Sequence, residues 1–277
     1  MKSAGVIGWP IEHSRSPLIH GYWLKQYGVD GRYTKEPVRP EDLTQFLSSL
    51  AARGLSGCNV TVPHKEAAFA RADIKDQSAI AVGAANTLWI ESGKLHAANT
   101  DTYGFMAHLA VEAPHWKRGD RSVAILGAGG AARAIVYGFL QAGVGDVRVF
   151  NRSIARAEDL AHHFGSRVKA FAWDAFAADA GDSSVLVNTT TRGMKGEGDI
   201  ELDLSFLKAD CVVADIVYVP LETGLLRRAR ARGLTTVDGL GMLLHQAVPG
   251  FHKWFGVKPE VTPELRALIE ADIRGHV

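Results

Sequence analysis

Residues 122–134, SVAILGAGGAARA, join a buried-type strand to a helix through a glycine-rich turn. Gly127, Gly129 and Ala132 follow the spacing G-x-G-x-x-G/A, in which the first glycine allows a tight turn and the small third residue permits close helix–strand packing. The second glycine lets the backbone approach a pyrophosphate, and the helix N-terminus supplies free N–H groups. Because the flanking strand and helix are both present, the segment predicts a dinucleotide-binding unit.

Buried-type strands and helical segments alternate after this unit, with further strands expected at residues 146–150, 185–190, 211–218 and 235–239. This alternation predicts a parallel sheet covered on both faces. The first hundred residues also predict an α/β fold, and residues 240–277 return to helix. Strands are expected there at 4–8, 32–38 and 58–62, helices at 18–28 and 41–54, and a hairpin over 86–101. We predict two domains, a discontinuous one of residues 1–103 plus 240–277 and a second of residues 104–239.

Composition excludes several classes of protein. The formal net charge is +1 without a long basic block, which argues against nucleic acid or an anionic membrane as the main partner. The N-terminal apolar run is too short for a signal peptide core, and the two cysteines are far apart without a CxxC pair, so a reduced cytoplasmic protein is expected. Cys58 and Cys211 form no CxxC pair and are expected to be small buried side chains. The 11 histidines show no metal-ligand spacing, so no metal is expected.

The residues after the second strand of the dinucleotide unit indicate which cofactor is preferred. NAD-binding proteins carry an acidic residue there for the ribose 2′-hydroxyl, whereas NADP-binding proteins use arginine for the 2′-phosphate. This chain has Asn151, Arg152, Ser153 and Arg156, and no acid at the tip. Two arginines can hold a phosphate with planar charged donors, although a solvated pair of arginines is the plainer interpretation. The pattern favours NADP(H).

Two segments offer groups for proton transfer. In NVTVPHK (59–65), Lys65 follows the end of a strand, where α/β folds concentrate ligand-binding groups. In NTDTYGF (99–105), Asp101 lies just past the hairpin at the start of a helix. Taken alone, Lys65 is more typical of a solvated surface charge and Asp101 of a helix N-cap. Their occurrence beside a dinucleotide unit favours a catalytic interpretation, because a nicotinamide enzyme needs such a group.

The motifs PIEHSRSPLIH, GLSGCNVTVPHKEAA, GAANTLW, NTDTYGF, LGAGGAARA, FNRSIARAE, NTTTRGM, DIVYVP and DGLGMLLHQA occur in this order over nearly the whole chain. Together they resemble the shikimate dehydrogenase family. The resemblance implies an α/β substrate-binding domain, a Rossmann NADP-binding domain and an active site between them. It also implies reversible NADPH-dependent reduction of the ketone of 3-dehydroshikimate to shikimate, on the route to aromatic amino acids.

The resemblance assigns roles residue by residue. The family's catalytic pair corresponds to Lys65 and Asp101. Its substrate-binding positions correspond to Ser14, Ser16, Asn59, Thr61, Asn86, Tyr218 and Gln246. Its cofactor-binding positions correspond to Gly127, Ala128, Gly129, Gly130, Ala131, Asn151, Arg152, Ser153, Arg156, Thr189, Thr190, Ile216, Gly239 and Met242. Neither the member of the pair that moves the proton nor the choice between monomer and homodimer follows from the sequence.

Several residues allow a second interpretation or depart from the family pattern. Ser16 precedes a proline and is also expected as a helix N-cap. Thr102 stands where the family commonly has glycine, Ser153 replaces a threonine, and Pro249 is expected to kink the last long helix. Two rivals stay open, a quinate/shikimate dehydrogenase with broader substrate use and a non-catalytic NADP(H)-binding sensor. The two arginines disfavour the first, and the presence of both Lys65 and Asp101 disfavours the second.

Overall fold

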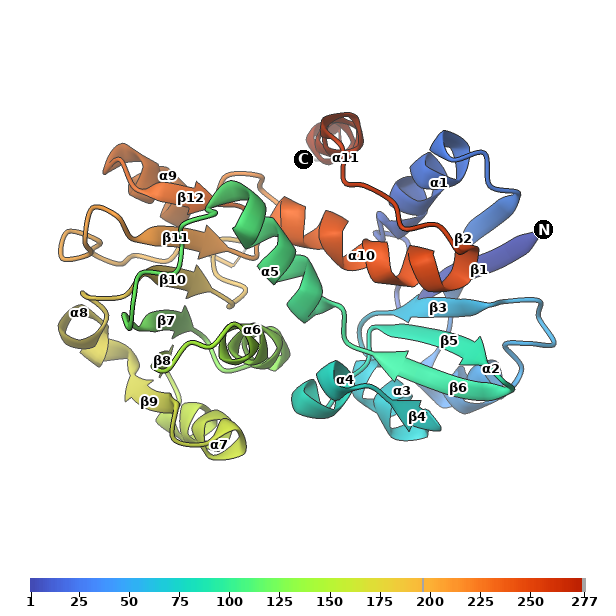
Figure 1. Cartoon of the computed structure of the whole chain (residues 1–277), viewed down its shortest axis with the longest axis horizontal. Helices are drawn as coiled ribbons and strands as arrows, with labels where there is room; N and C mark the ends of the chain where they lie inside the picture. The colour runs from blue at the N-terminus through green and yellow to red at the C-terminus, as the bar shows by residue number, and fades with distance from the viewer. Residues whose placement is uncertain (196, 276–277) are drawn as a thin grey trace. The chain divides into compact units, whose positions relative to one another are not determined.

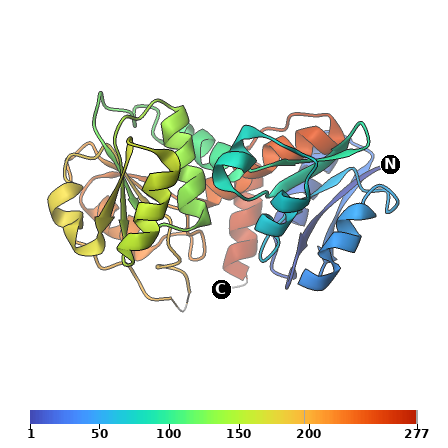
Figure 2. The ribbon, with the colours of Figure 1, turned by 90° about the horizontal axis from the view of Figure 1, so that it is seen from below.

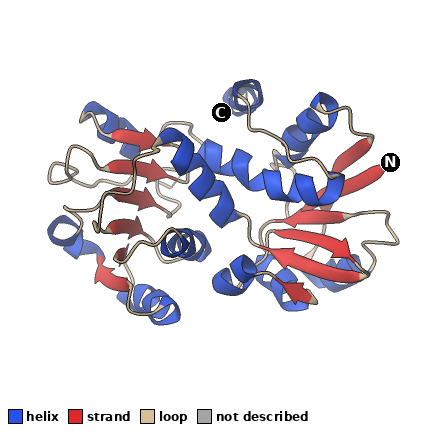
Figure 3. Ribbon diagram, in the orientation of Figure 1, coloured by secondary structure: helices blue, strands red, loops and turns tan. Residues whose placement is uncertain are grey.

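The computed structural model describes residues 1–195 and 197–275, and the chain forms two compact units. Unit 1 comprises Met1–Asp101 and Leu244–Ala271, and unit 2 comprises Thr102–Leu243 with the described residues after Ala271. Each unit contains one sheet together with helices (Figures 1 and 3). The α/β class predicted from the sequence is confirmed.

The sheet of unit 1 has the strand order β2-β1-β3-β5-β6-β4 within the described residues. Strands β1, β2 and β3 run parallel, β5 is antiparallel to both β3 and β6, and β4 is parallel to β6. The predicted hairpin is confirmed, because Glu91 pairs with Lys94 across a two-residue turn. The strands are β1 Lys2–Gly8, β2 Gly31–Pro37, β3 Gly57–Val60, β4 Ile74–Lys75, β5 Thr87–Glu91 and β6 Lys94–Ala98. The helices are α1 Ser16–Gln26, α2 Leu43–Ser48, α3 Lys65–Arg71 and α4 Gln77–Val82, with a 3-10 turn at Pro40–Asp42.

Helix α10 (Gly239–Phe255) contributes aromatic side chains to the core of unit 1. Ala247, Phe251 and Trp254 of this helix are buried, whereas Leu243 is half-buried and the next residue, Leu244, is fully buried. The indole of Trp254 donates to the carbonyl of Leu88 in β5 at 2.9 Å. The helix continues through Pro249.

The sheet of unit 2 has the order β12-β11-β10-β7-β8-β9, and all its strand pairs are parallel, as the alternation predicted. Figures 1 and 2 show α6 and α7 next to each other in this unit. The strands are β7 Val123–Leu126, β8 Val147–Asn151, β9 Val168–Ala172, β10 Val185–Asn188, β11 Val212–Asp215 and β12 Thr235–Val237. The helices are α5 Asp101–Glu112, α6 Gly130–Gln141, α7 Ile154–Phe164, α8 Phe176–Asp179 and α9 Gly224–Ala231, with a 3-10 turn at Trp173–Ala175. Helix α11 is Pro263–Gly275.

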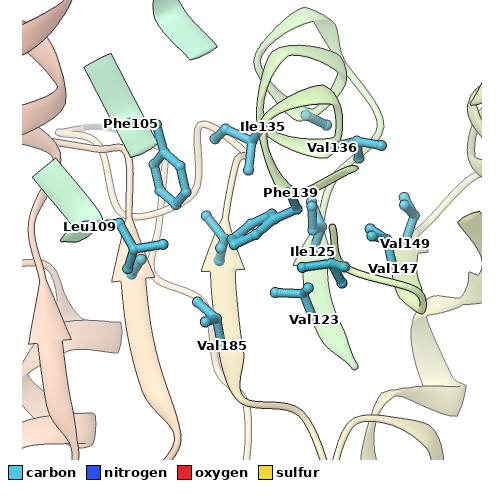
Figure 4. Packing of buried hydrophobic residues seen from close by; sticks show 14 of the residues in the cluster. Phe105, Leu109, Val123, Ile125, Ile135, Val136, Phe139, Val147, Val149 and Val185 are labelled. Carbon is cyan, nitrogen blue, oxygen red and sulfur yellow. The ribbon is translucent and has the colours of Figure 1, made fainter. Parts of the chain in front are cut away.

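Helices cover both faces of this parallel sheet. Because side chains alternate along a strand, Val123 and Ile125 of β7 belong to one buried cluster with residues of α5, α6 and α7 (Figure 4). The intervening Ala124 and Leu126 belong to a second cluster, with residues of α8 and α9. Because both faces of the sheet are buried, its strands are continuous apolar runs, and such runs can be recognised in the sequence.

Several predicted boundaries are wrong. The strand expected at 58–62 ends at Val60, because the chain then turns, with His64 N–H donating to the carbonyl of Thr61. The strand expected at 211–218 ends at Asp215, whose carboxylate accepts from the N–H of Val217 and starts a turn. Strand β9 was not predicted. Ser16 is not an N-cap: it is the first residue of α1, where no side chain caps the helix.

Both cysteines are buried, as expected. Burial raises the pKa of both thiols, that of Cys211 to about 12. Over residues 1–195 and 197–275, the helices include none with the length and apolar character needed to cross a bilayer. The same residues contain no cluster of three or more His, Cys, Asp or Glu side chains suited to a metal ion.

Candidate active site and cofactor site

Lys65 and Asp101 form an ion pair in unit 1. Lys65 is the first residue of α3 and Asp101 the first of α5, so each extends from a helix start next to the end of the sheet. Lys65 Nζ lies 2.8 Å from Asp101 Oδ2, and the side chains are 33% and 18% exposed. The amine and carboxylate are therefore held in contact while both keep access to solvent or a ligand.

Asn86 holds the other oxygen of the same carboxylate. Its Nδ2 donates to Asp101 Oδ1 at 2.8 Å and lies 3.5 Å from Gln246 Oε1. Asn86 immediately precedes β5 and is 3% exposed. Three residues predicted from separate motifs, together with Gln246 from α10, thus meet within unit 1.

Asn59 lies in the same hydrogen-bonded group, and its amide is fully engaged by protein atoms. Its Oδ1 accepts from the hydroxyl of Tyr33 at 2.6 Å, and its Nδ2 donates to the carbonyl of Asn86 at 3.2 Å and to Thr87 Oγ1 at 3.3 Å. Tyr33 and Thr87 were not among the predicted site residues. The signal that identifies Thr87 is the strand register, in which Asn59 of β3 faces Thr87 of β5.

The remaining predicted substrate residues are spread over three places. Ser14 Oγ accepts from the N–H of Ser16 at 3.4 Å, so these two serines are neighbours at the start of α1. Thr61 is half-buried just beyond β3, where its N–H donates to the carbonyl of Ile7. Tyr218 is half-buried and lies in unit 2, three residues after the end of β11.

The glycine-rich turn of unit 2 leaves its backbone open to a ligand. Gly127 has φ +102°, a backbone conformation that favours glycine, and a Cβ there would lie 2.8 Å from Thr189 Oγ1. Both the backbone conformation and the close contact exclude a larger residue. At Gly129 and Gly130, by contrast, a Cβ would meet nothing within 4 Å. Gly129 precedes the first residue of α6, whose N-terminal N–H groups are available to an anion. Ala128 and Ala131 are half-buried beside them.

The positions predicted for the 2′-phosphate lie on one exposed turn. Asn151 ends β8, Ser153 precedes the first residue of α7, and Asn151 Nδ2 donates to the carbonyl of Ser153 at 2.8 Å. Arg152, Ser153 and Arg156 are exposed, and the Ser153 side chain makes no capping bond to the helix. The turn therefore presents two guanidinium groups and one hydroxyl to solvent.

Asp215 organises the loops that follow β10 and β11. Its carboxylate accepts from Asn188 Nδ2 at 2.8 Å, from Thr223 Oγ1 at 2.7 Å and from the N–H of Val217 at 3.0 Å. Asn188 Oδ1 in turn accepts from the N–H and the hydroxyl of Thr190. Burial raises the pKa of Asp215 to about 6, against the three donors, which lower it.

The start of α10 completes the predicted cofactor residues. A Cβ on Gly239 would lie 2.2 Å from the carbonyl oxygen of Ile216, so only glycine lets these segments approach. Ile216 and Met242 are partly buried and pack against the same apolar cluster as α6. Thr189 Oγ1 donates to the carbonyl of Leu126 at 2.7 Å, which ties this loop to the end of β7.

Three family models match the chain. They describe a shikimate dehydrogenase substrate binding domain over residues 6–88, a shikimate/quinate 5-dehydrogenase over residues 109–193 and a shikimate 5′-dehydrogenase C-terminal domain over residues 239–268. The shikimate dehydrogenase (NADP(+)) of Azorhizobium caulinodans is 55% identical over 273 residues, which covers 99% of this chain and 97% of the relative.

Solved structures agree with these matches. The shikimate 5-dehydrogenase of Thermus thermophilus in complex with NADP(H) and shikimate superposes with a TM-score of 0.85 at 33% identity, covering 100% of both chains. The quinate dehydrogenase of Corynebacterium glutamicum in complex with NAD gives a TM-score of 0.89 at 30% identity, covering 98% of this chain and 99% of the other.

Proposed function

The chain belongs to the shikimate dehydrogenase family, and from this premise we propose that it catalyses the reversible NADPH-dependent reduction of 3-dehydroshikimate to shikimate. It is an oxidoreductase of the NADP(+)-dependent kind. The reaction serves the route to chorismate and the aromatic amino acids. Unit 1 is proposed as the substrate-binding domain and unit 2 as the NADP-binding domain.

One observation carries the catalytic assignment: Lys65 and Asn86 hold the two oxygens of Asp101, each at 2.8 Å. Reduction of a ketone needs a proton at the carbonyl oxygen, and oxidation of the alcohol needs a base there. We assign Lys65 and Asp101 as this proton-transfer pair. The ion pair holds the Lys65 amine against the carboxylate, where the two groups can exchange a proton with the substrate oxygen.

The substrate has one carboxylate and several hydroxyls, and the neutral polar residues of unit 1 suit it. We propose that Ser14 and Ser16, adjacent at the start of α1, bind the carboxylate. The hydroxyls are assigned to Thr61, Asn86 and Gln246, and Tyr218 is proposed as a further substrate-binding residue. Asn59, whose amide bonds to Tyr33, Asn86 and Thr87, is proposed to support this group of residues. Polar groups left unpaired by a wrong substrate cost about 1–3 kcal/mol each, which is the source of selectivity.

The proposed cofactor site fits a phosphorylated dinucleotide. The open backbone at Gly129 and Gly130 accommodates the pyrophosphate, and the exposed Arg152 and Arg156 suit a 2′-phosphate. When bound, NADPH supplies the hydride for the reduction. Ser153 adds a hydroxyl donor at the same turn, and the loops held by Asp215 carry Thr190 and Ile216.

The test is an assay of the purified protein with shikimate and NADP⁺, followed by nicotinamide absorbance, with NAD⁺ and quinate as parallel arms. We expect fast reduction only with shikimate and NADP⁺. A comparable rate with NAD⁺ would show that Arg152 and Arg156 do not determine the choice of cofactor. A comparable rate with quinate would show that the substrate pocket accepts more than shikimate. No turnover with any pair would instead favour a non-catalytic NADP(H)-binding sensor.

We further propose a cytoplasmic location, because two free buried cysteines suit a reducing compartment. A monomer or a homodimer is proposed, and light scattering coupled to gel filtration distinguishes them. Fractionation of cells with antibody detection tests the location.

A further inference from the structure

A continuous chain of hydrogen bonds in unit 1 connects Tyr33 to Lys65 and passes through Thr87. We propose that Thr87 is a positioning residue, whose hydroxyl fixes the side-chain amides of Asn59 and Asn86 and, through Asn86, the carboxylate of Asp101. The inference deepens the proposed function and rests on it for its catalytic consequence.

Strand register brings the members of the chain together. Asn59 in β3 is the antiparallel partner of Thr87 in β5, and residues directly opposite one another point to the same face of the sheet. Thr87 is 1% exposed and Asn59 is 5% exposed, so their polar atoms have to bond within the protein.

A backbone donor fixes the orientation of the Asn86 amide. The N–H of Thr100 donates to Asn86 Oδ1 at 2.8 Å, and a backbone N–H cannot act as an acceptor. The oxygen of the amide therefore faces Thr100, and the nitrogen faces Asp101 Oδ1. A reversed amide would lose both bonds, so the position of the catalytic carboxylate depends on this orientation.

A backbone acceptor fixes the orientation of the Asn59 amide in the same way. Asn59 Nδ2 lies 3.2 Å from the carbonyl oxygen of Asn86, so the amide oxygen faces the hydroxyl of Tyr33 and that hydroxyl donates. Burial raises the pKa of Tyr33 above its ordinary value, which keeps the phenol protonated as a donor. Its ring stacks on the buried His20, with centroids 4.0 Å apart.

The Thr87 hydroxyl lies between these two fixed amides. It accepts from Asn59 Nδ2 at 3.3 Å and donates to Asn86 Oδ1 at 3.1 Å. Thr100 Oγ1 lies 3.1 Å from the Thr87 hydroxyl and 3.1 Å from Asn86 Oδ1. A hydroxyl can donate and accept at once, whereas a methyl group can do neither. Without it, one N–H of Asn59 would be buried without a partner and Asn86 would lose one of the donors that hold its oxygen.

The experiment compares Thr87→Val, which keeps the shape and removes the hydroxyl, with Thr87→Ser, which keeps the hydroxyl and removes a methyl. Thr34→Val on β2 is the control for removal of a threonine hydroxyl from the same sheet, because that hydroxyl donates to Glu36 in its own strand. We expect Thr87→Val to lower kcat with shikimate by about tenfold, with KM for NADP⁺ unchanged within about twofold. Thr87→Ser and Thr34→Val should stay within about threefold of the parent kcat.

If Thr87 acted only through packing, Thr87→Ser would lower kcat more than Thr87→Val. Serine lacks the buried methyl group, whereas valine keeps it and fills the same volume. If Thr87→Ser lost more kcat than Thr87→Val, or if both kept it, the inference would be wrong. Tyr33→Phe provides a second perturbation of the same chain should Thr87→Val fail to fold. It keeps the ring and removes the donor to Asn59, and a kcat equal to that of the parent would overturn the proposal.

A readout without turnover separates this inference from the proposed function. The side-chain NH₂ groups of Asn59 and Asn86 give amide signals in ¹H–¹⁵N NMR spectra, and their exchange with solvent reports how firmly they are held. We expect that exchange to become about tenfold faster or more in Thr87→Val and to change little in Thr87→Ser. Unchanged exchange would refute the positioning role, whereas absence of turnover in the parent protein would refute only the proposed reaction.

Discussion

Asp215 makes the stability of unit 2 depend on pH in a direction opposite to that of most carboxylates. Burial raises its pKa from 3.8 to about 6. In the folded protein the group therefore keeps its proton up to about pH 6, while in the unfolded chain it loses the proton near pH 4. Because the folded state binds more protons between these values, its stability falls as the pH rises through this window.

The magnitude follows from the shift. A change of about two pKa units corresponds to about 3 kcal/mol, since one unit is about 1.4 kcal/mol. The side chain is 2% exposed, so solvent screens the effect little. Above about pH 6 this stabilisation of the folded state is lost, because Asp215 is then ionised. Its carboxylate accepts from Asn188, Thr223 and the N–H of Val217.

The assay is urea unfolding of the parent protein and of Asp215→Asn at pH values between 4 and 7, followed by circular dichroism. Asparagine has nearly the same shape and does not titrate, so the difference in unfolding free energy between the two proteins isolates Asp215 from the other carboxylates. We expect the parent to lose about 2–3 kcal/mol relative to the variant as the pH rises from 4 to 7. A difference that stays constant, or that grows in favour of the parent, would refute the reasoning, because the donors would then outweigh burial.

The remaining predictions concern catalysis, the cofactor and packing. Lys65→Ala should lower kcat about 100-fold or more in the shikimate assay with the fold intact by circular dichroism, and a near-normal rate would remove Lys65 from the mechanism. Arg152→Ala and Arg156→Ala should each raise KM for NADP⁺ about tenfold or more while leaving KM for NAD⁺ nearly unchanged; equal effects on both cofactors would contradict a phosphate-binding role. Gly239→Ala should weaken NADP⁺ binding and lower Tm, whereas Gly21→Ala, where a Cβ would meet nothing within 4 Å, should change neither; equal melting curves for the two would contradict the close approach.

The sequence predicted those turns and strands that are determined by residues next to one another in the chain. The turn at Gly127 needs only a glycine after a buried strand and before a helix, and the hairpin needs only Ser92 and Gly93 between two strand-like runs. The continuous apolar runs of β7 and β10 have helices on both faces, which a parallel sheet requires. These features were readable because the residues that cause them are adjacent in the chain.

Boundaries set by side-chain bonds were less predictable. β11 was expected to reach residue 218, but the carboxylate of Asp215 captures the N–H of Val217 and turns the chain. The hydrophobic character of residues 216 and 217 continues past this point, so a pattern of apolar residues cannot reveal it. Ser16 was expected as an N-cap, yet Ser14 supplies the hydroxyl that accepts the N–H of Ser16.

Tyr33 and Thr87 belong to the site through strand pairing and were not predicted from sequence motifs. Tyr33 and Asn59 are 26 positions apart, and Asn59 and Thr87 are 28 apart, so no local periodicity relates them. Asn59 and Thr87 meet because β3 pairs with β5 in one register, and a shift of that register by one residue would turn Thr87 to the opposite face. Tyr33 reaches Asn59 from β2, which lies on the other side of β1 from β3. The same register places the Thr87 hydroxyl 3.1 Å from the Asn86 amide oxygen, so it adds a second donor to the amide whose orientation the Thr100 N–H fixes. On this argument the sheet of unit 1 sets the geometry of the proposed proton-transfer pair, and a substitution inside β5 should alter catalysis without touching either Lys65 or Asp101.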